Sequence, residues 1–136
     1  MYEAQTKIRV RYGETDQMGY AYYGNYASYY EVARVESLRQ LGFAYRELEE
    51  IGIILPVLEN KSKYHKPARY DELLTIKVCI PEMPALKMKF CYEIFNEENL
   101  LINTGETTLV FLKKETMKPC RMPKVMIGLL EPYFVA

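Results

Sequence analysis

The amino-acid sequence predicts an α+β fold in which a curved antiparallel β-sheet of about five strands wraps one long central helix. A strand-like segment comes first, over residues 7–12, and a helix without internal Gly or Pro follows over residues 25–41. Four further strand-like segments then succeed one another, and consecutive strands of this kind usually pair antiparallel. With 136 residues, the chain has room for a single domain, residues 1–136, but not for two.

The first strand is predicted from a strict alternation of residue types. Across residues 7–12, three apolar side chains alternate with three basic ones, so that Ile8, Val10 and Tyr12 share one face. A period of two with one apolar face is typical of a half-buried strand.

The central helix is expected over residues 25–41. Asn25 is a favourable N-cap residue, and Gly42 stands where a helix that ends in a left-handed residue would place a glycine. The helix is apolar nearly all round, which is typical of a helix buried on several sides. We therefore expect the sheet to wrap it.

The second half of the chain contains mainly strands. A short helix is expected over residues 43–51, and the strands over residues 53–67, 75–80, 86–94 and 100–113, with a terminal helix over residues 123–130. Pro56 indicates an edge position, a bulge or a strand start within the first of these strands. Gly105 suggests a bulge in the last one.

Charge and composition argue against several classes of function. The 18 Lys and Arg residues balance 18 Asp and Glu residues, so the net charge gives no support for nucleic-acid binding. The first residues lack an apolar signal segment, and no stretch approaches the roughly 18 apolar residues of a membrane span. Cys79, Cys91 and Cys120 form no C-x-x-C pair, so we expect reduced thiols in a cytoplasmic protein.

The segment over residues 12–26 carries the strongest candidate site. It places Asp16 between a predicted strand and the start of a predicted helix. A carboxylate there can handle a proton or attack, while free N–H groups of the helix start can bind an oxyanion. The alternative is that Asp16 only closes an Asx-turn, a common role for Asp at strand exits. Gly19 and Gly24 allow close backbone approach, and Tyr22 with Tyr23 offers a partly apolar wall.

The remaining candidates carry weaker signals. His65 is the single histidine, so it cannot belong to a multi-His metal site, and no Ser stands in a Gly-x-Ser-x-Gly motif. His65 is expected at a pocket rim or in a structural role. Lys61, Lys87 and Lys89 stand on predicted strands, either as a solvated face or as contacts for phosphate groups.

The motif over residues 11–19, followed by residues 22–26 and 30–34, resembles the 4-hydroxybenzoyl-CoA thioesterase/YbgC-like family of hotdog-fold acyl-CoA thioesterases. Residues 64–74 resemble the K-P-A-x-x-D-x-L stretch of the same family. The resemblance spans nearly the whole chain. It implies a hotdog fold, a helix wrapped by an antiparallel sheet, assembled as homodimers or homotetramers with sites between subunits.

The resemblance also implies roles for individual residues. Asp16 would be the catalytic carboxylate, and the backbone N–H groups of Tyr23 and Gly24 would bind the thioester oxygen. YbgC-like members often carry His at this position, whereas this chain carries Tyr23. The expected substrate-binding residues are Gly19, Tyr22, Tyr26, Lys61, His65, Lys87 and Lys89.

The sequence thus predicts an acyl-CoA thioesterase that converts acyl-CoA and water to a carboxylic acid and CoA. Asp16 would act as a general base on water or as a nucleophile through a mixed anhydride. No metal or redox cofactor is expected, because CoA is part of the substrate. The alternatives are an acyl-CoA or acyl-carrier-protein binding module without hydrolysis, an acyl-carrier-protein thioesterase, or a dehydratase of the same fold.

Overall fold

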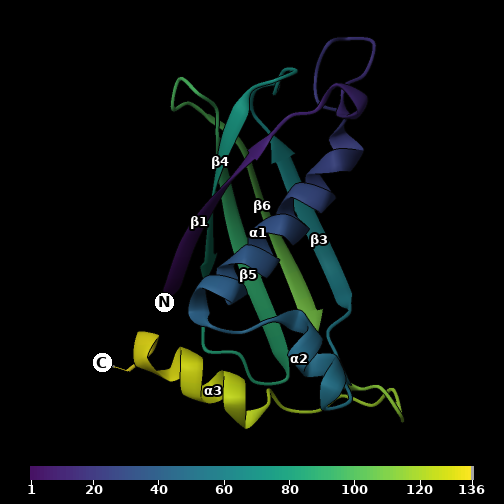
Figure 1. Ribbon diagram of the computed structural model, residues 1–136, viewed down its shortest axis with the longest axis vertical. Coiled ribbons are helices and arrows are strands. Elements are labelled where there is room, and N and C mark those ends of the chain that lie inside the picture. The colour runs from purple at the N-terminus through teal and green to yellow at the C-terminus, as the bar shows by residue number, and fades with distance from the viewer. Residues whose placement is uncertain (136) are drawn as a thin grey trace.

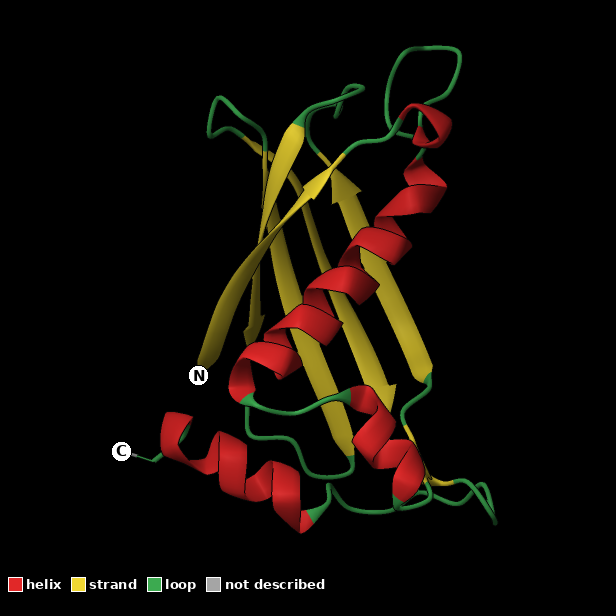
Figure 2. Cartoon of the chain, viewed as in Figure 1, coloured by secondary structure: helices red, strands yellow, loops and turns green. Residues whose placement is uncertain are grey.

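A computed structural model of the chain describes residues 1–135 and consists of an antiparallel sheet with a long helix lying across one face (Figures 1 and 2). The sheet has the strand order β1-β4-β5-β6-β3. Its strands are β1 Tyr2–Arg9, β3 Val57–Tyr64, β4 Leu73–Ile80, β5 Lys87–Phe95 and β6 Leu101–Val110. Two short strands, β2 Ile53–Ile54 and β7 Leu112–Lys113, pair separately. The predicted α+β architecture is confirmed.

The helices are α1 Tyr26–Leu41, α2 Tyr45–Glu50 and α3 Lys124–Leu130, with 3₁₀ turns η1 Tyr12–Glu14, η2 Tyr23–Asn25 and η3 Glu131–Tyr133. In Figure 1, α1 crosses the sheet diagonally, and α2 and α3 lie at the end of the sheet remote from residues 10–25. Gly42 ends α1 at φ 98°, as predicted, because a left-handed residue is needed there.

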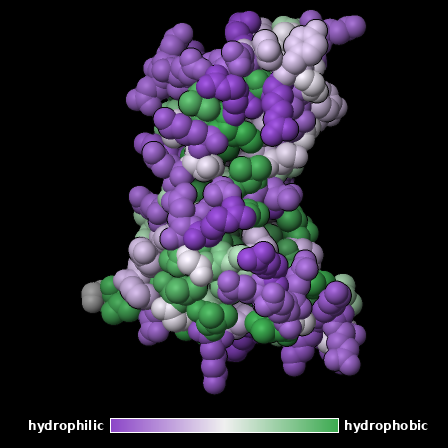
Figure 3. All heavy atoms as spheres, in the orientation of Figure 1, coloured by the Kyte–Doolittle hydropathy of each residue, from purple (hydrophilic) through white to green (hydrophobic). Residues whose placement is uncertain are grey.

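Only one face of α1 is buried within a single chain. Tyr29, Tyr30, Ala33 and Leu38 are at most 1% exposed and pack on the sheet, whereas Val32 on the other side is 39% exposed. The prediction that the helix is buried on several sides is therefore wrong for the isolated chain. On the molecular face seen in Figure 3, apolar areas alternate with hydrophilic side chains.

A buried polar network lies between α1 and the sheet. Arg34 is almost fully buried, and its guanidinium donates to the Tyr92 hydroxyl over 3.0 Å. The Tyr92 hydroxyl donates to Thr107, which donates in turn to Asn60 on the edge strand β3. A buried cation is costly without such partners, so this network compensates part of the desolvation of Arg34.

Four sequence predictions need correction. The strand expected over residues 100–113 ends with β6 at Val110, and Leu112–Lys113 form β7, which pairs with β2 in a separate sheet. The expected single strand over residues 53–67 is two strands in different sheets. β2 pairs with β7, β3 pairs with β6, and Pro56 lies between β2 and β3. Gly105 does not mark a bulge, since pairing runs in register through it to Ser62 and Tyr92. β1 ends at Arg9, and Tyr12 is 77% exposed.

Gly105 is required for a different reason. A Cβ atom at this position would lie 2.7 Å from the carbonyl oxygen of Lys61 and would also collide with the Tyr30 hydroxyl. The helix and the sheet approach too closely here for any side chain. Within residues 1–135, no helix has the length and apolar character needed to span a membrane.

Candidate active site

Asp16 closes a tight loop between η1 and η2. Its N–H donates to the carbonyl of Tyr20 over 2.9 Å, and the N–H of Gly19 donates to the Asp16 carbonyl. Its carboxylate oxygen Oδ1 accepts the N–H of Met18 over 2.9 Å, which makes an Asx-turn. Gly19 has φ 81°, a conformation that favours glycine. The turn uses Oδ1, and Oδ2 accepts no hydrogen bond within residues 1–135.

Glu14 ties this loop to the start of α1. Its carbonyl oxygen accepts the N–H of Tyr22 over 2.8 Å and the side-chain amide of Asn25 over 2.7 Å. Its carboxylate accepts the N–H of Arg11 and the hydroxyl of Tyr29, both over 2.9 Å. Because one residue holds both sides, the Asp16 loop and the helix start have a fixed relative position.

The helix start presents free donors. η2 runs directly into α1, so Tyr23 and Gly24 are the first residues of one continuous helical segment. Their N–H groups find no acceptor within residues 1–135, and Tyr22, which precedes them, provides no side-chain cap. Two unpartnered N–H groups at a helix N-terminus form an anion-binding position.

Tyrosine side chains surround these donors. The ring of Tyr22 covers Gly24, where a Cβ atom would approach it to 2.7 Å. Tyr22 packs on Tyr23 with ring centroids 4.7 Å apart, and Tyr64 of β3 approaches Tyr23 edge-on at 6.5 Å. A hydrogen bond with the Tyr23 phenol and, more weakly, the charge of Asp16 raise the pKa of Tyr22. The backbone bond from the Tyr22 N–H to the Glu14 carbonyl joins the tyrosine wall to the Asp16 loop.

Tyr26 supports the wall from beneath. It is 3% exposed and packs edge-on against Tyr29 and Tyr64 at 5.4 and 5.1 Å. Burial raises the pKa of Tyr26 to about 12. The structure thus brings Asp16, Gly19, Tyr22, Tyr23 and Gly24 together at the surface, and it places Tyr26 in the core below them.

The predicted basic contacts lie elsewhere in a single chain. His65 is exposed, and its Nε2 lies 3.1 Å from the Thr104 hydroxyl on the sheet face that α1 does not cover. Lys61 and Lys89 pair with Glu106 at 3.6 and 3.0 Å on the same face. Lys87 begins β5 at the far end of the sheet, so it is not brought near Asp16 within one chain.

Sequence reasoning missed the residues that organise the site. Glu14, Tyr29 and Tyr64 were not singled out, because their contacts join segments 15 to 41 positions apart. Asn25 was expected to cap the helix, but its side chain donates to Glu14 instead. Within the described residues 1–135, no group of three or more His, Cys, Asp or Glu side chains gathers as a metal site would require.

Comparisons with known proteins agree with this fold. A profile described as the thioesterase-like superfamily matches residues 10–130. The acyl-CoA thioester hydrolase YbgC of Escherichia coli O157:H7 is 34% identical over 121 residues, which cover 89% of this chain and 90% of that protein. Among solved structures, the DHNA-CoA thioesterase of Staphylococcus aureus is 40% identical, with a TM-score of 0.86 and coverage of 98% of this chain and 85% of that one.

A solved 4-hydroxybenzoyl-CoA thioesterase shares the fold at 21% identity, with a TM-score of 0.85 and coverage of 95% of this chain and 99% of that one. The match to the superfamily profile spans most of the chain, including the Asp16 loop and the start of α1. The chain therefore belongs to the thioesterase-like superfamily of hotdog-fold proteins and is a thioester hydrolase.

Proposed function

We propose that this enzyme hydrolyses an acyl-CoA thioester at the Asp16 loop and the start of α1. The observation that carries the proposal is the joint placement of a carboxylate with a free Oδ2 and two unpartnered N–H groups, held together by Glu14. The names of the related acyl-CoA and DHNA-CoA thioesterases support CoA as the carrier of the acyl group.

In the proposed reaction, the N–H groups of Tyr23 and Gly24 bind the thioester carbonyl oxygen and stabilise the negative charge that develops on it. Asp16 uses Oδ2 either to take a proton from water or to attack the carbonyl carbon as a nucleophile. The CoA thiolate is a good leaving group and needs little acid assistance. The proposed steps use no metal and no redox cofactor.

Tyr22, Tyr23 and Tyr64 would line the acyl side of this site. These residues are 47%, 64% and 49% exposed in one chain, so a substrate can contact them. Gly19 leaves room beside the Asp16 carboxylate. Tyr26 would act through Tyr64, whose ring it supports.

A second copy of the chain would complete the site. β3 pairs with β6 on one side only, and Val57 and Leu58 on it are 48% and 56% exposed. A free edge with apolar side chains favours pairing with another strand. We propose a homodimer or homotetramer, in which Lys61, His65, Lys87 and Lys89 contribute contacts for the CoA phosphates.

The test is Asp16→Asn, assayed by thiol release from short-chain, long-chain and aromatic acyl-CoAs. The amide oxygen of Asn still accepts the Met18 N–H, so the turn and the melting temperature should be retained. Loss of a general base or nucleophile should lower kcat by roughly 10²- to 10⁴-fold. Full activity in Asp16→Asn would contradict the role of the carboxylate.

Binding gives an independent readout. Free CoA or a slowly hydrolysed acyl-CoA should raise the melting temperature of the wild-type enzyme, because a ligand that binds only the folded state stabilises it. An enzyme that is stabilised by acyl-CoA but hydrolyses no thioester would be a binding module. If only thioesters on acyl-carrier protein are hydrolysed, the carrier in the proposal is wrong.

A further inference from the structure

Tyr29 of α1 carries a buried hydroxyl group that contacts the Asp16 loop without being part of the proposed reaction. The residue is 1% exposed, and its hydroxyl donates to Oε1 of Glu14 over 2.9 Å. The same Oε1 accepts the N–H of Arg11, also over 2.9 Å. Glu14 is the last residue of η1 and stands two positions before Asp16. Tyr29 therefore holds the residue from which the Asp16 loop extends.

The Tyr29 phenol remains a hydrogen-bond donor at neutral pH. Burial, followed by the hydrogen bond to the Glu14 carboxylate and the charge of that group, raises the pKa of Tyr29. A hydrogen bond to an ionised acceptor is roughly twice as strong as one between neutral groups. The contact between Tyr29 and Glu14 is therefore a firm one.

Six residues form a closed ring of contacts around the start of α1. In order, they are Glu14, Tyr29, Tyr26, Tyr64, Tyr23 and Tyr22. Neighbouring tyrosine rings have centroids 4.7–6.5 Å apart, and the N–H of Tyr22 closes the ring by donating to the Glu14 carbonyl over 2.8 Å. The ring thus meets the Asp16 loop at two points of Glu14, the carbonyl and the carboxylate.

The two points have different consequences for the loop. The N–H of Tyr22 and the amide of Asn25 both end at the Glu14 carbonyl oxygen. A residue held at one atom can still rotate about it, whereas a second point fixes its orientation. The hydroxyl of Tyr29 supplies that second point from α1.

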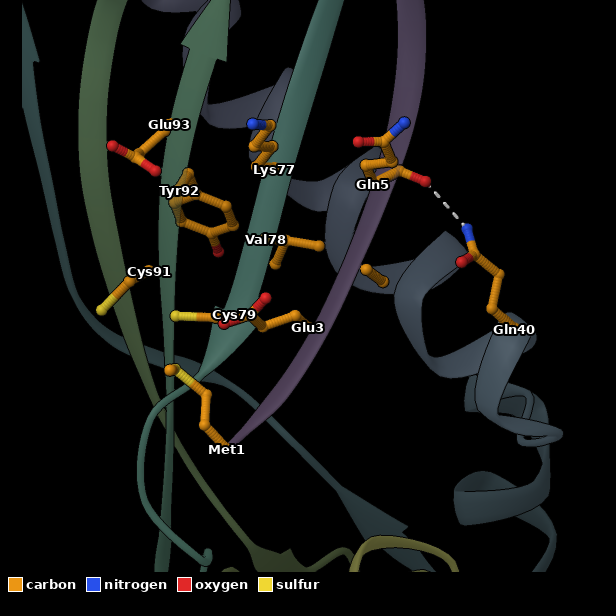
Figure 4. A pocket seen from close by; sticks show the side chains of 11 residues that line it. Met1, Glu3, Gln5, Gln40, Lys77, Val78, Cys79, Cys91, Tyr92 and Glu93 are labelled. Carbon is orange, nitrogen blue, oxygen red and sulfur yellow. Dashed lines mark hydrogen bonds between the residues drawn. The ribbon is translucent and has the colours of Figure 1, made fainter. Parts of the chain in front are cut away.

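The position of α1 on the sheet does not depend on Tyr29 alone. Near the other end of the helix, the Tyr2 hydroxyl donates to the Ser37 carbonyl over 2.6 Å, and the Gln40 amide donates to the Gln5 carbonyl over 3.0 Å. Figure 4 shows the bond of Gln40 beside a cavity of about 830 Å³ that Gln5 and Gln40 both line. Loss of the Tyr29 hydroxyl should therefore leave the helix in place and loosen only the Asp16 loop.

The proposed reaction needs this loop in one position. Asp16 stands on the loop, whereas the N–H groups of Tyr23 and Gly24 belong to the helical segment. The carboxylate and the donors must meet one thioester group, and a misplacement of about 1 Å can lower a rate by roughly 10²-fold. The contacts that join loop and helix therefore bear on catalysis.

We propose that Tyr29 is a positioning residue for the proposed hydrolysis at Asp16, on which this role rests. Acting through the Glu14 carboxylate, Tyr29 fixes the orientation of the Asp16 loop relative to the N–H groups of Tyr23 and Gly24. It touches no substrate and transfers no proton.

The first test is Tyr29→Phe, which removes one hydroxyl group and keeps the ring packing against Tyr26. In a thiol-release assay with acyl-CoA, kcat should fall by about 10-fold or more, because the carboxylate and the oxyanion donors lose their fixed relative position. KM should stay near the wild-type value, since the tyrosine wall is retained.

Tyr30→Phe is the matched control. Tyr30 is the next residue of α1 and is equally buried, but its hydroxyl bonds to Asn103 and Ser62. Both variants lose a buried hydroxyl group, so their melting temperatures should fall comparably, while kcat of Tyr30→Phe should equal that of wild type. Equal losses of kcat would trace the effect to a general softening of α1 and overturn the role of Tyr29.

Variants of Glu14 test the path from Tyr29 to the loop. Both bonds to the carboxylate end at Oε1, and the amide oxygen of Gln can accept them, so Glu14→Gln should keep more of kcat than Glu14→Ala. The double variant Glu14→Ala/Tyr29→Phe should lose no more than Glu14→Ala alone, because both changes break the same contact. Additive losses would show that Tyr29 does not act through Glu14.

Asp16→Asn, assayed beside these variants, separates the positioning role from the proposed function. If Asp16→Asn is inactive and Tyr29→Phe keeps the wild-type kcat, hydrolysis at Asp16 stands and the positioning role is wrong. If Asp16→Asn is fully active, the proposed function is wrong, and the positioning role fails with it.

Discussion

The side-chain amide of Asn25 donates to the carbonyl oxygen of Glu14 over 2.7 Å, although Asn25 stands directly before α1. An Asn at a helix start usually accepts from the helix N–H groups with its side-chain oxygen. Here the amide faces the Asp16 loop instead, and the N–H groups of Tyr23 and Gly24 stay unpartnered. An N-cap side chain accepts from N–H groups that follow it, so Asn25 does not compete for those of Tyr23 and Gly24, which precede it; its amide instead ties the helix start to the Asp16 loop.

Replacing Asn25 by Asp should separate catalysis from stability. A carboxylate cannot donate to the Glu14 carbonyl, and it adds negative charge to the first turn of the helical segment whose N–H groups would bind the proposed oxyanion. We expect kcat to fall by roughly a hundredfold. The melting temperature should change little, because a carboxylate in the first helical turn contributes about 0.3–1 kcal/mol, against about 1 kcal/mol for the lost hydrogen bond.

The control for this prediction is Asn25→Ala, which loses the same hydrogen bond without adding charge. Steady-state kinetics and thermal melts of both variants should show the larger loss of kcat in Asn25→Asp and the larger loss of stability in Asn25→Ala. Equal kcat values for the two variants would mean that charge at this position does not reach the reacting oxygen.

Gly24→Ala should alter substrate binding with little effect on stability. The new Cβ would meet Tyr22 at 2.7 Å, and this contact is with an exposed ring that can swing aside. Because the ring forms part of the proposed acyl wall, we expect KM to rise by about 10-fold or more, in the range that one lost apolar contact costs.

Gly13→Ala is the matched control for that variant. Gly13 lies in the neighbouring 3₁₀ turn, and a Cβ there would meet no atom within 4 Å. Its kinetics should equal those of wild type. If Gly13→Ala and Gly24→Ala raise KM alike, the effect reflects the loop backbone and not the Tyr22 ring.

The strands of the sheet could be predicted well, because the alternation that marks a strand lies in residues that are neighbours in the sequence. In β5, the alternation that begins at residue 86 correctly placed Met88, Phe90, Tyr92 and Ile94 in the core, each at most 2% exposed, whereas Leu86, just before the strand, is 46% exposed. Such a pattern needs only neighbouring residues to be recognised. The same holds for the helix, predicted over residues 25–41 and observed over residues 26–41, and for the Gly42 that ends it.

The site was only partly predictable, because its organisation depends on distant contacts. Asp16 and the helix start could be found from one motif. Glu14 and Tyr29, by contrast, form a hydrogen bond although they stand 15 positions apart, and neither residue type predicts this contact. Gly105 shows the same limit: its backbone follows ordinary strand pairing, and only the approach of Tyr30 from α1 explains the glycine.

Gly105→Ala should destabilise the fold without touching the site. A Cβ there meets the backbone carbonyl of Lys61 at 2.7 Å, and neither β3 nor α1 can move away freely. Overpacking of this kind typically costs about 1–3 kcal/mol. Urea unfolding should show a lower midpoint, and kcat of the folded fraction should be unchanged.

Gly128→Ala should have the opposite effect on the urea midpoint. Gly128 lies inside α3 and a Cβ there meets nothing within 4 Å, so Ala should stabilise the protein by about 0.5–1 kcal/mol. A Gly105→Ala variant as stable as wild type would show that Tyr30 and the β3 backbone can relax.

Alkaline pH should unfold the protein through its buried tyrosines. Burial raises the pKa of Tyr26 and of Tyr30 to about 12, above the value of 10.0 expected in an unfolded chain. The folded state therefore holds these two protons more tightly. The resulting stability is fully present below pH 10 and is lost as the pH rises from about 10 towards 12.

Thermal melts between about pH 8 and pH 12 should show a melting temperature that falls steeply above about pH 10. Tyr26→Phe removes one titrating group while keeping most of the ring packing against Tyr29 and Tyr64, so its curve should fall less steeply. Exposed Tyr12 supplies the control, because Tyr12→Phe should reproduce the wild-type slope. If Tyr26→Phe also follows the wild-type curve, ionisation of Tyr26 does not drive the alkaline transition, and the slope must come from other groups.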